Sequence, residues 1–268
     1  KRKVFLINGR LSEKSFQNYK RLLFFMDNIF SKINFIVCQG MKDLDRFIKL
    51  GVNEKQIKRD FSFKFDSLQL NQNSVFEKNH KMKDKKIIIC ASTHHPEEEI
   101  LIQAFQKLDL ENTIIILVPR HPDRAKAVYK KINDTGLSIS LFSEENSKLD
   151  YSKQVILVDK IGHLESLFSI ADIAFIGGSL IPHGGQNFLE AVKFSLPISS
   201  GQSVFNFQEI AHDLLKHKIL KQGNSSEELS NIWYEQLCDS SSELKKISQD
   251  YISKRKGASK RTLELLPL

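Results

Sequence analysis

The chain has 268 residues, enough for one large domain or two modest ones, with 41% hydrophobic and 27% charged residues, as is ordinary for a globular protein. The net charge of +8 favours an anionic partner (a phosphate ligand, an acidic membrane surface or nucleic acid), unless many of the 40 Lys and Arg residues are simply solvated surface. Three widely spaced cysteines without a CxxC motif favour a reduced, cytoplasmic compartment. No apolar run is long enough to span a membrane, and a start at Lys-Arg-Lys without Met leads us to expect a fragment.

The first 66 residues alternate strand-like and helical patterns. Ser12 is a good N-cap for the first helix, and Gly51 is a typical helix end. The strands expected here are 4–8, 34–39 and 57–65, and the helices are 13–30 and 43–50. Residues 67–84 then lose periodicity and become rich in Asn, Gln and Lys. We therefore predict a domain at 1–66 and a linker at 67–84.

From residue 85 onward short apolar runs alternate regularly with helical patterns. The expected strands are 87–91, 113–118, 137–142, 155–158, 173–176 and 196–199. The expected helices are 96–108, 122–132, 163–170 and 187–194, with three more helical stretches to the C-terminus. Such alternation predicts a parallel sheet covered on both faces, with ligands at the carboxyl ends of its strands. Residues 85–268 would form this second domain.

The stretch 175–190 carries the strongest functional pattern. An apolar strand ends in a glycine pair followed by Ser179, and a second glycine pair precedes a helix carrying Asn187 and Glu190. Glycines let backbone N–H groups approach a ligand, and a helix N-terminus favours an anion. A carboxylate in that helix can accept hydrogen bonds from sugar hydroxyls. The stretch predicts a site for a phosphorylated ligand that contains ribose.

Three other loops follow predicted strands. In 92–95, Thr93 offers a hydroxyl to an anion, or the loop merely caps the next helix. In 119–124, Arg120, His121 and Arg124 form a candidate anion clamp, although Arg124 could instead pair with a carboxylate of the protein. In 159–164, Gly162 could expose backbone donors, which alone is a weak signal.

Several classes of site are disfavoured. The eight histidines lack metal-ligand spacing, and no Cys/His quartet occurs, so we expect no metal. Walker, GxGxxG and GxSxG motifs are missing. The aromatic residues are mostly Phe within apolar patterns, which is typical of a hydrophobic core and not of a surface that stacks on bases. We therefore expect no nucleic-acid partner.

Six motifs together resemble one known family. NGRLSEKSF at 8–16, FKFD at 63–66, ASTHHPEEE at 91–99, LVPRHPDR at 117–124, ADIAFIGGSL at 171–180 and GGQNFLEAV at 184–192 are similar to the 3-deoxy-D-manno-octulosonic acid (Kdo) transferases of lipopolysaccharide synthesis. The resemblance implies an α/β fold of GT-B type, with a complete Rossmann-like C-terminal domain and the tail end of a Rossmann-like N-terminal domain. It also implies inverting transfer of Kdo from CMP-Kdo to a lipid A precursor, with no cofactor and no metal in the catalytic step.

The same resemblance assigns residues. Arg120 matches the arginine that meets the donor nucleotide, and Glu190 is expected at its ribose. Arg10 and Ser12 are candidate cleft residues of the first domain. The residues expected to bind the donor are Thr93, Arg120, His121, Gly162, Gly178, Ser179, Gly185, Asn187 and Glu190.

This sequence also departs from the family pattern. Gln186, Phe188 and Ala191 replace His, Pro and Pro, His163 stands where Glu is common, and His95-Pro96 replaces Glu-Gly. The family's membrane anchor and its catalytic Glu are expected upstream of this chain, which would place the enzyme at the cytoplasmic face of the bacterial inner membrane, facing an anionic surface. The alternatives are a non-catalytic nucleotide-binding remnant and a GT-B enzyme that uses another nucleotide sugar.

Overall fold

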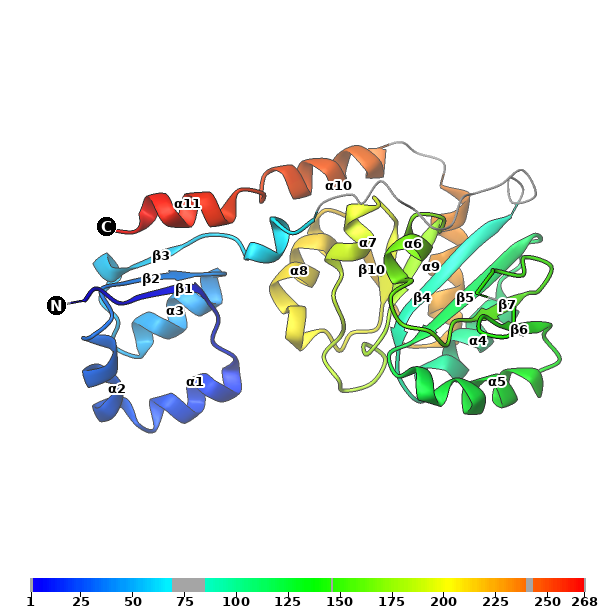
Figure 1. Ribbon diagram of the computed structural model, residues 1–268, viewed down its shortest axis with the longest axis horizontal. Coiled ribbons are helices and arrows are strands. Elements are labelled where there is room, and N and C mark those ends of the chain that lie inside the picture. The colour runs from blue at the N-terminus through cyan, green and yellow to red at the C-terminus, as the bar shows by residue number, and fades with distance from the viewer. Residues whose placement is uncertain (1, 69–84, 146, 240–242, 268) are drawn as a thin grey trace. The chain divides into compact units, whose positions relative to one another are not determined.

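The computed structural model describes residues 2–68, 85–145, 147–239 and 243–267 (Figure 1). Two compact units divide the chain. Unit 1 comprises Lys1–Gln69 and Tyr251–Leu268, and unit 2 comprises Leu70–Asp250. Most of the linker predicted at 67–84 falls outside the described residues. Within the described ranges, every helix is too short or too polar to cross a bilayer.

Unit 1 is built on a parallel sheet with the strand order β1-β2-β3. Its strands are β1 (Phe5–Gly9), β2 (Phe35–Cys38) and β3 (Ile57–Arg59), and the helices that follow the first two strands are α1 (Glu13–Lys20), α2 (Leu23–Phe30) and α3 (Met41–Lys49). The helix expected over 13–30 is therefore two helices. The Leu22 N–H bonds the Tyr19 carbonyl and closes α1, and the turn lets Phe16 and Phe30 pack into one core. The strand expected over 57–65 ends at Arg59.

The C-terminal segment packs against unit 1, which corrects the boundary predicted for the second domain at 85–268. Helix α11 (Ala258–Leu265) begins at the carboxylate of Asp66, which accepts N–H groups from Gly257, Ala258 and Ser259 at 2.6, 3.1 and 2.7 Å. Arg261 pairs with Asp60 at 3.0 Å. Since these contacts join residues almost two hundred positions apart, periodicity along the sequence could not reveal them.

Unit 2 contains a seven-stranded parallel sheet in the order β10-β9-β8-β4-β5-β7-β6. The strands are β4 (Lys86–Thr93), β5 (Thr113–Pro119), β6 (Ile139–Leu141), β7 (Val155–Leu157), β8 (Ile173–Ile176), β9 (Ile198–Ser200) and β10 (Leu220–Gln222). From β4 the chain builds the sheet outward through β5, then returns to place β8 on the other side of β4. The strand order therefore reverses at β4, and ligands of open α/β sheets bind at such a reversal, beyond the carboxyl ends of the strands.

Helices cover this sheet. They are α4 (Glu97–Lys107), α5 (Ala125–Asn133), α6 (Leu164–Phe168), α7 (Leu189–Lys193), α8 (Gln208–Lys216), α9 (Ser226–Cys238) and the first part of α10 (Glu243–Ser253). Strand β5 is buried along its whole length, as expected of a central parallel strand. Trp233 of α9 is buried in the same cluster as Leu101 of α4, and its indole N–H donates to the Ser199 hydroxyl at 2.9 Å. The helices on this side of the sheet thus share one buried core with its strands.

Candidate functional site

The loops after β4, β5 and β8 come together at the strand-order reversal. A Cβ on Gly177 would lie 2.4 Å from the Ser92 carbonyl oxygen, so only glycine allows the β8 loop to pass so close to the end of β4. The Arg120 N–H donates to the Thr93 carbonyl at 2.9 Å and ties the β5 loop to the same place. The structure therefore brings together three of the four loops singled out in the sequence.

A carboxylate of the protein occupies the glycine loop. Glu97, which is 0% exposed, accepts backbone N–H groups from His94, Gly178, Ser179 and Leu180 at 2.8, 2.7, 2.9 and 2.9 Å. We expected the loop's N–H groups to face a ligand phosphate, but in the structure this internal anion takes them. Locally, Glu97 is only an acidic residue in the first turn of α4, because three of its four partners, Gly178, Ser179 and Leu180, lie more than 80 positions away.

Thr93 and Arg124 belong to a second internal network. The buried Thr93 hydroxyl donates to Glu98 at 2.9 Å. Arg124 donates to both oxygens of the same carboxylate at 3.2 Å each, a bidentate geometry. Arg124 therefore pairs with a carboxylate of the protein, the alternative left open by the sequence. The Thr93 side chain fixes the end of β4 to α4.

Ser179 and Gly185 shape the rest of the glycine loop. Ser179 is 1% exposed, and its hydroxyl donates to the Ile176 carbonyl at 2.6 Å and accepts the Gly201 N–H at 2.8 Å. Gly185 has a φ of +76° and donates its N–H to the Gly178 carbonyl at 2.7 Å. Both residues close the loop on itself, and donor contacts from them stay a prediction.

Asn187 and Glu190 form a pair at the start of α7. The Asn187 amide donates to the Glu190 carboxylate at 3.1 Å, and its carbonyl oxygen accepts the Leu189 N–H at 3.2 Å. Both side chains are half-buried. The pair thus presents a carboxylate in a fixed orientation at the end of the β8 loop, and its contact with a ribose stays a prediction.

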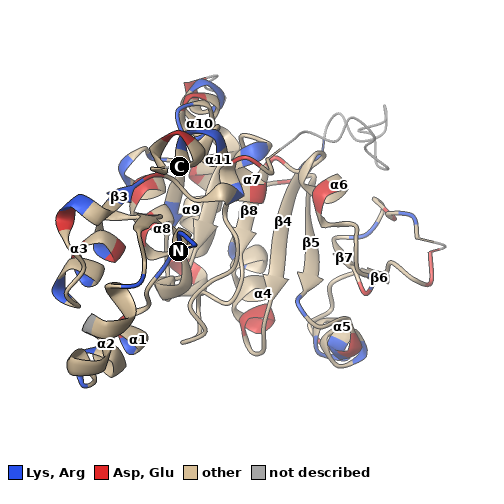
Figure 2. Cartoon of the chain, turned by 60° about the vertical axis from the view of Figure 1, so that its left-hand side comes forward, with Lys and Arg blue, Asp and Glu red and all other residues tan. Residues whose placement is uncertain are grey.

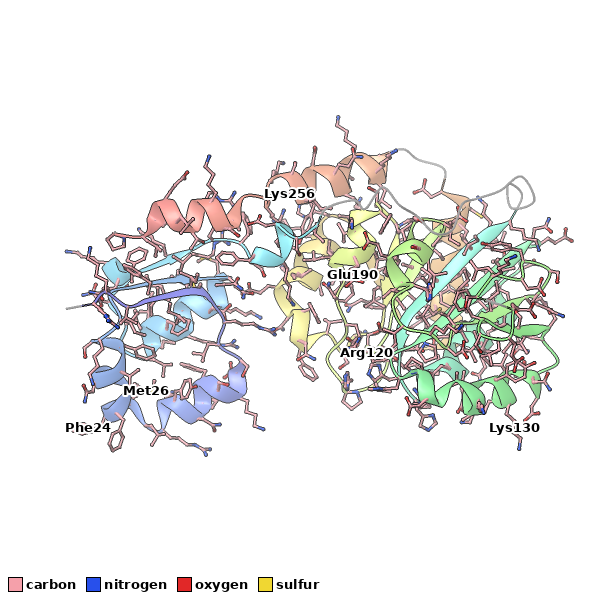
Figure 3. The ribbon with its side chains drawn as sticks, viewed as in Figure 1. Phe24, Met26, Arg120, Lys130, Glu190 and Lys256 are labelled. Atoms are coloured by element: carbon pink, nitrogen blue, oxygen red, sulfur yellow. The ribbon has the colours of Figure 1, made fainter. Side chains whose placement is uncertain are left out.

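Arg120 and three histidines form the basic rim of the site. Arg120 is exposed, and its guanidinium has no partner among the residues that the structure describes (Figure 3). The His94 ring lies 4.2 Å from the His183 ring and 5.9 Å from the His121 ring. Burial, and secondarily the neighbouring His183, lowers the pKa of His94. Sequence reasoning named His121 but missed His94 and His183, since their loops are far apart in the chain.

The remaining candidates lie elsewhere. Gly162 has a φ of +94° in an exposed turn after β7, separated from β4 by β5. Arg10 and Ser12 lie in unit 1, where the Ser12 hydroxyl accepts the Ser15 N–H at 3.1 Å and caps α1 as predicted. Arg10 is exposed beside Lys64, whose pKa is lowered first by burial and then by the Arg10 charge. Within the described part of the chain, no group of three or more His, Cys, Asp or Glu side chains could hold a metal ion.

Comparison with known proteins supports the family resemblance. Residues 1–67 match the family model described as 3-deoxy-D-manno-octulosonic-acid transferase (kdotransferase). A 3-deoxy-D-manno-octulosonic acid transferase of Rickettsia bellii is 33% identical over 231 residues, which cover 85% of this chain and 55% of the relative. One of Haemophilus influenzae is 30% identical over 272 residues, which cover 97% of this chain and 63% of the relative. The chain thus spans somewhat more than half the length of these relatives.

Solved structures support the fold. The C-terminal CMP-Kdo binding domain of WaaA from Acinetobacter baumannii is similar with a TM-score of 0.60 and 26% identity, covering 65% of this chain and 92% of that domain. Anabaena HepE, solved with UDP and glucose, is similar with a TM-score of 0.57 and 16% identity over 99% of this chain and 72% of HepE. The predicted α/β fold of GT-B type is confirmed. By sequence and fold, the chain is a relative of the 3-deoxy-D-manno-octulosonic acid transferases, as its motifs predicted.

Proposed function

We propose that this chain is the donor-binding portion of an inverting glycosyltransferase that transfers Kdo from CMP-Kdo to a lipid A precursor in lipopolysaccharide synthesis. The observation that carries the proposal is the Glu190 carboxylate, oriented by Asn187. It lies at the same sheet edge as the exposed guanidinium of Arg120, which has no partner among the described residues. A carboxylate accepts hydrogen bonds from both hydroxyls of a ribose, and an arginine binds a phosphate. Together they match the two polar ends of a nucleoside monophosphate.

Arg120 also has a chemical role in this proposal. When the bond between Kdo and CMP breaks, negative charge develops on the departing phosphate. A fixed cation stabilises that charge more than it stabilises the ground state, which lowers the barrier. We propose that the step needs no cofactor and no metal ion, and we assign no catalytic base to any residue of this chain.

Binding of CMP to the chain, measured by isothermal titration calorimetry, tests the proposal. Glu190→Gln and Arg120→Ala should each weaken binding about tenfold or more, the effect of losing a hydrogen bond to a charged group. Glu99→Gln is the matched control, because Glu99 is an exposed carboxylate on α4 paired with Lys131. Unchanged affinity in both site variants, or a chain that does not bind CMP, would contradict the donor site.

We further propose that the protein works at the cytoplasmic face of the inner membrane, on an anionic lipid surface. Helix α2 and the residue before it support this with an exposed apolar face. We define this face as Leu22, Phe24, Phe25 and Ile29, which are 52%, 87%, 64% and 51% exposed. Figure 3 shows Phe24 pointing away from unit 1 and Met26 toward its interior, and in Figure 2 the α2 ribbon carries almost no charged residues. Side chains of this kind insert into the boundary between headgroups and acyl chains.

A further inference from the structure

Three histidines meet where the strand order reverses. His94 follows β4, His121 follows β5 and His183 lies in the loop after β8. The rings of His94 and His183 are 4.2 Å apart and tilted by 37°, and His121 meets His94 edge-on at 5.9 Å. His94 is 9% exposed, whereas His121 and His183 are exposed. The cluster thus has one buried ring, that of His94, and two rings open to solvent.

Contacts with Asn206 and Gly178 define the surroundings of His183. The Asn206 amide donates to the His183 carbonyl at 2.9 Å. A Cβ on Gly178 would lie 3.2 Å from the His183 ring, so the absence of a side chain at Gly178 makes room for it. The main chain of His183 is therefore held by a contact that does not depend on the charge of its ring, and Gly178 leaves space for that ring beside His94.

The buried ring has a defined charge state. Nδ1 of His94 lies 3.1 Å from the Ser92 carbonyl oxygen, which can only accept, so Nδ1 carries a hydrogen. Burial, then His183 and to a smaller extent His121 lower the pKa of His94. The Glu97 carboxylate, 4.0 Å from Nδ1, and the backbone hydrogen bond to Ser92 act in the opposite direction. The lowered pKa favours the neutral form of His94, and the two tilted rings of His94 and His183 repel each other if both are charged.

We propose that His121 and His183, whose rings lie against the buried His94, bind the oxyanion of the nucleotide donor and take up a proton as it binds. This inference rests on the proposed donor site and adds to it two residues, His94 and His183, that the family motifs did not assign. An anion beside a neutral imidazole stabilises the protonated form and raises the pKa of the ring. His94 acts as a positioning residue. Arg120 adds a permanent charge next to His121, so the rim carries both a fixed and a pH-dependent cation.

Histidine titration by NMR tests this directly on the unmodified 268-residue chain. The ring shifts of 13C-labelled histidines are followed with pH, with and without saturating CMP, and assigned by single substitutions. We expect CMP to raise the pKa of His183 or His121 by about one unit, which corresponds to tenfold tighter binding by the protonated form. His217, in the turn after α8, should not move. CMP that binds without shifting either curve would overturn this inference alone, whereas a chain that binds no CMP would overturn the donor site as well.

A substitution gives a second readout. His183→Asn should weaken CMP binding about tenfold at pH 6.5 and less than twofold at pH 8.5, because a bound proton is what the proposal requires and imidazoles lose protons as the pH rises. Cytidine, which has no phosphate, should bind wild type and variant equally, and His217→Asn should match wild type at both pH values. An equal loss of CMP affinity at both pH values would mean that His183 only supports the loop, and would overturn the proposal.

Discussion

The carboxylate of Glu97 accepts a 2.7 Å hydrogen bond from the backbone N–H of Gly178, and the same carboxylate also holds the N–H groups of His94, Ser179 and Leu180. A loop whose amide groups converge on an anion commonly receives that anion from a ligand. Here α4 supplies it. The glycine loop is therefore held in shape by a carboxylate of the protein itself, and under the proposed function the side chains at the rim would meet the donor's phosphate.

Glu97→Gln should destabilise unit 2 strongly. Glutamine replaces one acceptor oxygen by an NH₂ group that faces backbone N–H donors, so hydrogen bonds are lost in a site with 0% exposure. Breaking such a buried, charged network costs about 3–5 kcal/mol. Chemical denaturation followed by circular dichroism measures the change in the free energy of unfolding.

Glu99→Gln is the control for this experiment, since Glu99 lies on the same helix but pairs with Lys131 at the surface. An exposed ion pair contributes about 0–1 kcal/mol, so this variant should unfold almost like wild type. Equal stability of the two variants would show that the Glu97 network does not hold the loop.

Local sequence patterns predicted the framework of unit 2 well. Uniformly apolar runs such as 87–91 and 173–176 lie within or coincide with buried parallel strands, and the functional loops follow their carboxyl ends as expected. Patterns failed where a segment is short or polar. Strand β10 has only 3 residues, two of which are Lys221 and Gln222, so it carries no strand-like apolar run.

The internal partners of the site were not predictable in the same way. The sequence offered Gly178 and Ser179 as ligand contacts because it showed glycines near a helix. It could not show that Glu97 accepts the N–H groups of the loop, or that Glu98 accepts hydrogen bonds from both Thr93 and Arg124, since these are tertiary contacts. Arg120 and Glu190 take part in neither of these two networks, so their contacts with a donor nucleotide stay predictions.

The stability of the chain should decrease at mildly acidic pH, in part through His94. Its pKa is lowered in the folded state from the ordinary value of 6.5, so the unfolded chain binds the proton more readily. The contribution of His94 is fully present above pH 6.5 and is lost as the pH falls through its lowered folded-state pKa. His94→Asn should therefore show a flatter decrease in Tm between pH 7 and pH 5, with His217→Asn as the control. Parallel Tm curves for wild type and His94→Asn would contradict this.

Asp66→Ala should release helix α11 from unit 1. Partial burial alone would raise the pKa of Asp66, but hydrogen bonds from Ser259, Gly257 and Ala258 hold it below its ordinary value. Losing an acceptor at a helix start costs about 0.5–2 kcal/mol. Hydrogen exchange of the amides in 257–265 should become faster, whereas Asp45→Ala, which removes an exposed i,i+4 pair with Lys49 on α3, should leave it unchanged. Protection of α11 that survives Asp66→Ala would mean that Arg261 and its neighbours hold the helix by themselves.

The exposed apolar face of α2 should bind lipid surfaces. Phe24 and Phe25 are 87% and 64% exposed, and burying an aromatic side chain in a bilayer interface is favourable by about 1.5–3 kcal/mol. The exposed Lys20, Arg21 and Lys32 flank the helix and would meet acidic headgroups, each contributing about 1 kcal/mol. Cosedimentation with vesicles containing anionic phospholipid should therefore fall at least tenfold in the Phe24→Ser, Phe25→Ser double variant.

Two controls distinguish vesicle binding through this face from nonspecific adsorption of the protein. Phe205→Ser removes an aromatic side chain that is 60% exposed in unit 2 and should leave vesicle binding unchanged. Vesicles of neutral phospholipid should bind the wild-type chain less, and added salt should weaken binding to the anionic ones, because screening reduces only the electrostatic part. If the α2 variant sediments like wild type while Phe205→Ser does not, the lipid-binding surface lies in unit 2.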